Sequence, residues 1–359
     1  MTTLTEHPTT ASAEAFAEQF FGATQHALQM LAAYLGDRLG YYGALAEHGP
    51  VTPEELATRT GTHPRYAREW LEQQAVIGWL EATAGDQGRR YGMSDGVAEV
   101  MTDGQSLLYS APLARLFGLA TQLPALLRAY RTGGGVSWSQ FGADARESIA
   151  EMNHPWFTHA LPDALRATAS IDRILRRPGA RIADIGCGAG SSSVALARTY
   201  PDATVDGYDI DEPSIAMARE RAQAEQIDDR VFFHAADAAD LDGTYDVVFA
   251  FECVHDMPRP VEALAAARRA LRPGGTVVVM DEAVGDTFTA PGDFVEQLCY
   301  SISLLVCLPD AMSHQPSAAT GTVMRPETLR GYARAAGFAD IEVLPISDFG
   351  LWRFYRLVL

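Results

Sequence analysis

The stretch that decides the fold is RIADIGCGAGSS, residues 181–192, in which a short apolar run ends in alternating glycines. The run predicts a buried strand. Glycines allow a sharp turn into a helix and let the backbone approach a ligand closely. A dinucleotide fingerprint G-x-G-x-x-G would require its third glycine at position 191, where the chain has Ser191 and places Gly190 instead. The stretch therefore predicts a ligand-binding strand-to-helix turn and disfavours the NAD pattern.

The sequence after residue 180 alternates between strand-like and helix-like segments. The β-rich runs are RIADIG, TVDGYDI, RVFFHA, YDVVFAF and TVVVMDE, and SSSVALARTY, EPSIAMARERAQAEQ and PVEALAAARRAL lie between them. Such alternation predicts an α/β fold, with a parallel sheet that carries helices on both faces. Sheets of this kind bind ligands at the carboxyl ends of their strands.

Acidic residues follow two of these strands. Asp209 ends the second strand, where a carboxylate accepts hydrogen bonds from both hydroxyls of a ribose, and Ile210 beside it is placed to cover an adenine face. Asp237 and Ala238 follow the third strand, where a carboxylate accepts from an adenine amino group. The motif LRPGG, residues 271–275, precedes the fifth strand.

Taken together, D-x-G-x-G-x-G, the acid after the second strand, the Asp-Ala pair and LRPGG resemble the class I S-adenosylmethionine (SAM) dependent methyltransferases over about residues 180–359. The resemblance implies a Rossmann-like sheet of seven strands, the last two of which would be ADIEVLP (339–345) and LWRFYRLVL (351–359). It also implies SAM as cofactor, contacted by Asp184, Gly186, Cys187, Gly188, Asp209, Ile210, Asp237, Ala238, Phe251 and Glu252.

The first hundred residues predict a winged-helix domain. Apolar side chains recur at helical spacing over residues 14–44, and Thr52 with Glu55 forms a capping box around Pro53. A second helix is expected from about His63, followed by a hairpin over residues 79–94. We accordingly divide the chain into a loose tail (1–13), a winged-helix dimerisation and lid domain (14–100), a mostly helical connector (101–178) and a methyltransferase domain (179–359) with a cap insertion at 285–325.

Charge argues against a DNA-binding role for the winged helix. Residues 1–100 contain six Arg against thirteen Asp and Glu, and the whole chain has a formal charge of −18. Nucleic acids and anionic membranes both require clustered positive charge. We therefore expect neither as a partner, although a DNA-binding regulator that senses SAM or a metabolite stays open as an alternative.

The winged-helix front end narrows the resemblance to the small-molecule O-methyltransferases of plants and bacteria, which dimerise through such a domain. These enzymes place a His-Asp pair just beyond the fourth strand, and His255-Asp256 stands at the matching position. The resemblance implies that His255 is a general base for a hydroxyl, most simply that of a phenolic secondary metabolite. Glu282 is our candidate for the acid that orients it. Neutral imidazole accepts protons near pH 7, whereas a phenol has a pKa near 10.

Other candidate residues carry weaker signals. Met152, Asn153, Phe157 and His159 lie on a helix shortly before the sheet domain and are expected to line the substrate pocket, with core packing of the aromatics as the alternative. The cap insertion is expected to combine a helix over about 294–308 with a loop from Pro309, in which His314 would be a solvated residue. We expect no metal, because the further carboxylate and Asn of metal-dependent catechol-type enzymes are not found.

The cell compartment and the acceptor are less constrained. The four cysteines show no metal or disulfide spacing, no secretory signal is recognised, and the longest apolar run, about 302–308, is too short to span a bilayer. A cytoplasmic homodimer acting on a small molecule is expected. C- or N-methylation on the same scaffold remains the alternative to O-methylation.

Overall fold

The computed structural model describes residues 12–85 and 88–359, and most of the predicted tail (1–13) lies outside this range. The chain forms two compact units. The first comprises Met1–Asp103 with Leu113–Phe117, and the second comprises Gly104–Pro112 with Gly118–Leu359. The predicted connector after residue 118 thus belongs to the same unit as the sheet.

The first unit is the predicted winged helix. Thr52 and Glu55 form the expected capping box at the start of the third helix, with Pro53 in its first turn. His63 caps the fourth helix, and an antiparallel hairpin pairs Glu81 with Gly92. The elements are α1 (Ala13–Arg38), α2 (Tyr41–His48), α3 (Pro53–Thr60), α4 (Pro64–Val76), β1 (Glu81–Gly85), β2 (Gly88–Gly92) and α5 (Asp95–Thr102).

A run of helices follows, broken by a glycine-rich segment as the sequence predicts. The longest, α8, contains a kink at Gly142, whose φ of 80° is non-helical, and ends at Pro155 before a wide helical turn. The elements are α6 (Pro112–Arg115), η1 (Leu116–Gln122), α7 (Leu123–Thr132), α8 (Trp138–Pro155), η2 (Trp156–Ala160), α9 (Leu161–Ala167) and α10 (Ala169–Leu175).

The second unit is built on a seven-stranded sheet, as predicted, and its strand order is β5-β4-β3-β6-β7-β9-β8. Strands β3 to β7 are parallel, and β9 pairs antiparallel with both β7 and β8. The strands are β3 (Arg181–Ile185), β4 (Thr204–Asp209), β5 (Val231–Ala235), β6 (Tyr245–Phe251), β7 (Leu271–Glu282), β8 (Asp340–Val343) and β9 (Trp352–Val358).

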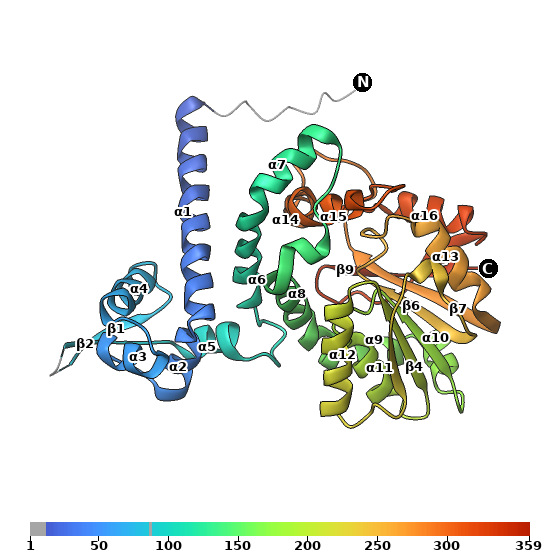
Figure 1. Ribbon diagram of the computed structural model, residues 1–359, viewed down its shortest axis with the longest axis horizontal. Helices are drawn as coiled ribbons and strands as arrows, with labels where there is room; N and C mark the ends of the chain where they lie inside the picture. The colour runs from blue at the N-terminus through green and yellow to red at the C-terminus, as the bar shows by residue number, and fades with distance from the viewer. Residues whose placement is uncertain (1–11, 86–87) are drawn as a thin grey trace, which may run out of the picture. The chain divides into compact units, whose positions relative to one another are not determined.

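Helices cover both faces of this sheet and give two separate cores (Figure 1). One core joins the sheet to α9, α10, α11 (Ser191–Thr199) and α12 (Glu212–Ala224). The other joins it to α13 (Pro260–Arg269) and α16 (Pro326–Ala335), and a short turn, η3 (Ala238–Asp240), contacts α13. β6 is buried at every position, as expected for a central parallel strand.

The cap insertion is more helical than the sequence predicts. Helical structure runs continuously through α14 (Phe294–Ile302), η4 (Ser303–Cys307) and α15 (Leu308–Ser313), whereas we expected a loop from Pro309. The wide turn of η4 places Pro309 in the first turn of α15, where a missing N–H costs nothing. By length and composition alone, Phe294–Ser313 could cross a membrane, a test that core helices of soluble proteins also pass.

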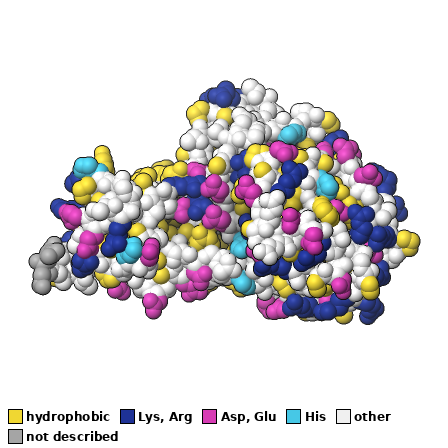
Figure 2. Space-filling view, turned by 60° about the horizontal axis from the view of Figure 1, so that its bottom comes forward, with side chains coloured by type: hydrophobic (Ala, Val, Ile, Leu, Met, Phe, Trp, Pro, Cys, Tyr) yellow, Lys and Arg dark blue, Asp and Glu magenta, His cyan; other side chains and the backbone are white. Residues whose placement is uncertain are grey.

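On the face of the molecule that Figure 2 shows, positive and negative charges are mixed rather than segregated. Arginine and acidic side chains of the described residues intermingle there. A nucleic-acid reader needs a continuous basic face. This pattern, together with the acidic first hundred residues, continues to disfavour the DNA-binding alternative.

Candidate active site

The glycine turn after β3 brings an unsatisfied carboxylate to the predicted cofactor site. Asp184 is fully buried, and its Oδ2 accepts hydrogen bonds of 2.6 Å from the hydroxyls of Ser192 and Ser193. Its Oδ1 is buried and has no hydrogen-bond partner among the described residues. Burial raises the pKa of Asp184 to about 6, although the serine hydrogen bonds oppose this. A cationic donor such as the amino group of SAM fits this oxygen.

The glycines of the turn, Gly186, Gly188 and Gly190, differ in their surroundings, as Gly188 and Gly190 show. Each has a positive φ, which favours glycine. A Cβ on Gly190 would lie 2.7 Å from the Phe233 ring, whereas one on Gly188 would meet open space. Gly190 therefore allows close helix packing, and Gly188 leaves the backbone open on the side where a ligand is expected.

Asp209 at the end of β4 is positioned by the same turn. Its Oδ2 accepts from the Gly188 amide at 2.9 Å, and its Oδ1 accepts from the Asp211 amide at 2.8 Å. Ile210 is 56% exposed, which leaves it available to cover an adenine ring. Cys187, by contrast, is buried in the core, so any contact it makes with a cofactor would use its backbone.

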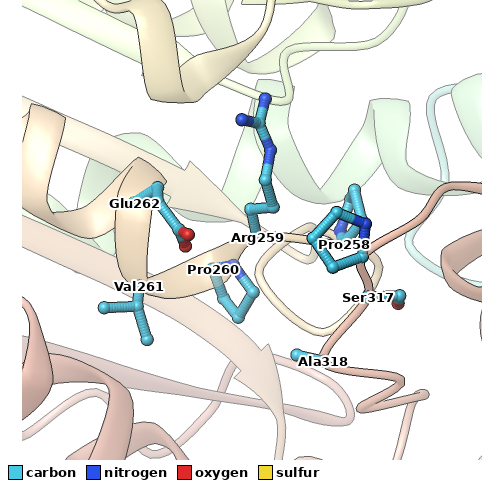
Figure 3. A pocket seen from close by; sticks show the side chains of 8 residues that line it. Pro258, Arg259, Pro260, Val261, Glu262, Ser317 and Ala318 are labelled. Carbon is cyan, nitrogen blue, oxygen red and sulfur yellow. The ribbon is translucent and has the colours of Figure 1, made fainter.

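Asp237 is engaged by protein groups in this structure. Its Oδ1 accepts from the Ala239 amide at 2.8 Å, and its Oδ2 lies 2.5 Å from the Arg259 guanidinium. The neighbouring Ala238 is buried. Arg259 also borders a surface pocket lined by Pro258, Pro260, Val261, Glu262, Pro316, Ser317 and Ala318, and its guanidinium points away from it (Figure 3). This pocket contains none of the predicted substrate side chains.

The register of the central strands builds the second half of the site. Phe251 of β6 lies opposite Met280 of β7, and the Glu252 amide donates to the Met280 carbonyl at 2.7 Å. The residues that follow β6 therefore lie beside the end of β7, which brings His255 to Asp281 and Glu282. Cys253 ties this group to the glycine turn, because its Sγ lies 3.1 Å from the Ile185 carbonyl oxygen.

His255 lies within a ring of carboxylates and is 2% exposed. Its Nδ1 is 2.9 Å from Asp281 Oδ1 and 3.3 Å from Glu282 Oε2, and its Nε2 is 3.4 Å from Asp256 Oδ1. Burial alone would lower the pKa of His255, but Asp256, Asp281 and Glu282 together raise it well above 6.5. We expected a neutral imidazole. The structure instead shows one whose protonated form the surrounding carboxylates stabilise.

Glu252 is held in an uncommon backbone conformation at the edge of this group, with a φ of 53°. Its Oε2 accepts a 2.6 Å hydrogen bond from the Asn153 amide, and the nearby Trp352 side chain acts to lower the pKa of its carboxyl. Burial raises the pKa of Glu252 despite these contacts. Asn153, predicted for the substrate pocket, thus reaches the same cluster from α8.

The cap closes the cluster from the other side. Cys307 in η4 lies beside His255 and Asp256, with one ligand atom of each residue within 4.8 Å of the others, and burial raises the pKa of its thiol. Cys299 in α14 is also buried. The cap helix is therefore apolar where it packs and polar where it meets His255.

The remaining predicted substrate residues lie apart from this cluster. Phe157 is buried in the core, where its ring contacts that of Phe251 at a centroid distance of 5.4 Å. His159 is exposed and hydrogen-bonds with Gln105. Met152 is half-buried, and His314 is exposed as predicted.

Sequence reasoning missed two neighbours of His255, Asp281 and Cys307, and one hydrogen bond beside it. Asp281 is nearer to it than the predicted Glu282, and neither Cys307 nor the Asn153–Glu252 hydrogen bond was expected. The contact of Asp281 could have been found from the sequence. When the apolar cores of β6 and β7 are aligned as parallel neighbours, the residues DE at the end of β7 lie beside ECVHD, which begins just after β6. Cys307 comes from a distant insertion, and no local pattern announces its contact.

Comparison with known proteins agrees with this geometry. Residues 176–317 match the family model "Methyltransferase domain", and residues 27–102 match "Rv2258c-like winged HTH domain". The chain is 42% identical over 108 residues to 27-O-demethylrifamycin SV methyltransferase of Amycolatopsis mediterranei, a match that covers 29% of this chain and 39% of the relative. It thus spans about two fifths of that relative's length.

Longer matches are also found. The ubiquinone biosynthesis O-methyltransferase of Aromatoleum aromaticum is 30% identical over 191 residues, which cover 52% of this chain and 76% of the relative. The solved mitomycin 7-O-methyltransferase MmcR has the same fold, with a TM-score of 0.70 at 20% identity over 97% of this chain and 99% of that one. The glycine turn, the sheet and these matches show that the chain belongs to the class I SAM-dependent methyltransferases.

Proposed function

We propose that the protein transfers the methyl group of SAM to a hydroxyl of a small, most simply phenolic, molecule, with His255 as general base. The observation that carries the proposal is the buried hydrogen-bonding contact of 2.9 Å between His255 Nδ1 and Asp281 Oδ1. It lies at the end of β6, linked through Cys253 to the predicted SAM turn. Several relatives are named as O-methyltransferases, which supports oxygen as the atom that accepts the methyl group.

The carboxylates supply the chemical reason for a histidine here. SAM provides a methyl group on a positively charged sulfur, which a phenol attacks readily only after losing its proton. A phenol has a pKa of about 10, so a base whose own pKa is raised takes that proton with a smaller energetic penalty. Asp281 stabilises the imidazolium that forms, as an acid paired with histidine does in other enzymes.

The acceptor must reach a nitrogen of His255 that is now covered. Nδ1 is held by Asp281, which leaves Nε2, near Asp256 and Cys307. The Asp256 side chain is 37% exposed, so it can swing aside without opening the core. We propose that the acceptor hydroxyl takes its place at Nε2.

The test is release of S-adenosylhomocysteine over a panel of phenols, carboxylic acids, amines and 2-oxo acids. His255→Ala should lower turnover of phenols by about 10²–10⁴ while SAM affinity stays nearly unchanged. His26→Ala, on the exposed surface of α1, is the matched control and should behave as wild type. Equal turnover by His255→Ala and wild type would remove the base assignment.

N-methylation is the second candidate. Four carboxylates surround His255 or contact its neighbours, and such a site stabilises the positive charge of a methylated amine. Turnover confined to amines, with the methyl group on nitrogen, would establish this reading. C-methylation has no such observation in its favour and would be indicated by turnover of 2-oxo acids alone.

A further inference from the structure

The carboxylate cluster, defined as Glu252, Asp256, Asp281 and Glu282 around His255, sets four acidic side chains against one basic side chain. His255 is the basic side chain that the described contacts place within it. Arg353 lies opposite Asp281 in the strand register but donates instead to the Val284 carbonyl and the Tyr355 hydroxyl. Even with His255 protonated, four ionised carboxylates would leave a net charge of about −3 in a buried site, which is unfavourable without a cationic partner.

The unsatisfied atoms of the cluster share one chemical character. Asp256 Oδ1, Asp281 Oδ2 and Glu282 Oε2 are buried without hydrogen-bond partners among the described residues, as is Asn153 Oδ1 beside Glu252. All four atoms are acceptors. Either protons held by the carboxylates, or a ligand that brings donors, positive charge or both, would complete the site.

These side chains are too deeply buried for bulk water to supply the missing hydrogen-bond donors. Asn153, Asp281 and Glu282 are each at least nine-tenths buried, and they come from α8 and from the end of β7. Burial raises the pKa values of Glu252 and Glu282, and neighbouring carboxylates contribute to the shift. Both groups therefore gain from a cation, which favours their ionised forms.

The position of these unsatisfied acceptor atoms indicates which ligand supplies the cation. Asn153 belongs to the segment expected to face the acceptor, and Asp256 is the partly exposed member beside His255 Nε2. A phenolate formed there would be repelled by the carboxylates unless the same molecule brought a compensating charge. An ammonium group offers three donors to the unsatisfied acceptors.

We propose that the acceptor carries a protonated amine near the hydroxyl that is methylated, and that the carboxylate cluster binds this amine. The inference rests on the proposed function. In the transfer, the bond between sulfur and the methyl carbon breaks, the bond between that carbon and the phenol oxygen forms, and the phenol proton passes to His255. The ammonium is unchanged and offsets the charge of the phenolate and the cluster.

The experiment uses matched phenols that differ only in the charge at the end of one side chain. Tyramine is positive, 4-propylphenol is neutral and 3-(4-hydroxyphenyl)propionate is negative. With the full-length protein and SAM, kcat/KM should be at least tenfold higher for tyramine than for 4-propylphenol and lowest for the acid. The methyl group should be found on oxygen.

Asp256→Asn should reduce the tyramine preference by about tenfold, since it removes one charge from the cluster at nearly constant shape. The matched control is Asp163→Asn, whose side chain is 83% exposed, and it should keep the wild-type ratio. The ratio is measured within one protein preparation, so a general loss of activity does not imitate the effect. A ratio unchanged by Asp256→Asn would overturn the assignment of the cluster to the amine.

The remaining outcomes separate this inference from the proposed function. Equal turnover of all three phenols would leave O-methylation standing and overturn the amine site. If no phenol is turned over, the proposed function fails, and binding then tests the amine site separately. Calorimetry measures how tightly tyramine and 4-propylphenol bind to the protein loaded with S-adenosylhomocysteine. Tighter binding of tyramine supports the amine site, and equal binding overturns it. A melting temperature raised by Mn²⁺ or Zn²⁺ but not by tyramine would also overturn it.

Discussion

At the residue scale, the chemistry depends on the ionisation of His255. The groups that face it are Asp256, Asp281, Glu282 and the Cys307 thiol, and the three carboxylates together raise its pKa well above 6.5. A general base acts in its deprotonated form, so that form becomes abundant only above the raised pKa. Activity should therefore climb with pH on the alkaline side of 6.5 rather than level off there.

Asp281→Asn tests this reasoning directly. Loss of one carboxylate lowers the pKa of His255, so the rising limb of kcat/KM against pH should move to lower pH by about one to three units. The maximal rate should fall because the imidazolium loses its partner. A limb that stays in place would contradict the pairing of Asp281 with His255.

Of the predicted SAM contacts, that of Asp209 is expected to contribute most to the affinity for SAM. Asp209→Ala removes the expected charge-assisted hydrogen bonds to the ribose and should weaken SAM binding by roughly tenfold to a hundredfold. Isothermal titration calorimetry measures this, with the exposed Asp202→Ala as the matched control. Unchanged affinity would refute the ribose assignment.

At the scale of elements, the turn between β3 and α11 offers a matched pair of glycines. Gly188 and Gly190 both have positive φ, but only Gly190 is packed against Phe233 and Ala218. Gly188→Ala should cost about 1–2 kcal/mol of unfolding free energy through backbone strain alone. Gly190→Ala should cost roughly 2–4 kcal/mol, because overpacking adds to that strain.

Thermal or urea unfolding without SAM measures the difference. Gly22→Ala, on α1 in open space, is the control and should not destabilise the protein, because Ala favours helix. Equal costs at positions 188 and 190 would mean that close packing of α11 is not what fixes Gly190.

The secondary-structure elements also show which features of the structure can be predicted from the sequence. Alternating apolar runs and helical segments predicted the parallel strands, and the capping box at Thr52 fixed the start of α3, because these signals are local. The contact of Asp281 with His255 depends on the register of β6 against β7, and that of Cys307 depends on how the cap folds back. Both are non-local, and strand or helix periodicity does not encode them.

At the scale of the whole molecule, α1 presents an apolar face that suggests a partner. Six of its large apolar side chains are at least 40% exposed, and their spacing places them on one side of the helix: Phe16, Phe20, Phe21, Leu28, Leu31 and Leu35. The family resemblance implies dimerisation through this domain. Homodimerisation therefore stays our prediction, with α1 as the contact.

Phe20→Asp should convert the dimer to a monomer, since it places a charge in the centre of an apolar contact. Size-exclusion chromatography with light scattering reports the mass, and His26→Asp, on the opposite side of α1, is the control. A wild-type protein that is monomeric at micromolar concentration, or a dimer that survives Phe20→Asp, would contradict the prediction.

The central claim is methyl transfer from SAM to an acceptor oxygen, and locating the methyl group tests it most directly. The protein is incubated with SAM labelled with ¹³C in its methyl group and with a phenol that is turned over, and the product is examined by NMR. Wild type should form a labelled methyl ether, and this product should be nearly absent with His255→Ala. A label on nitrogen or carbon, or an ether formed equally by both proteins, would contradict this claim.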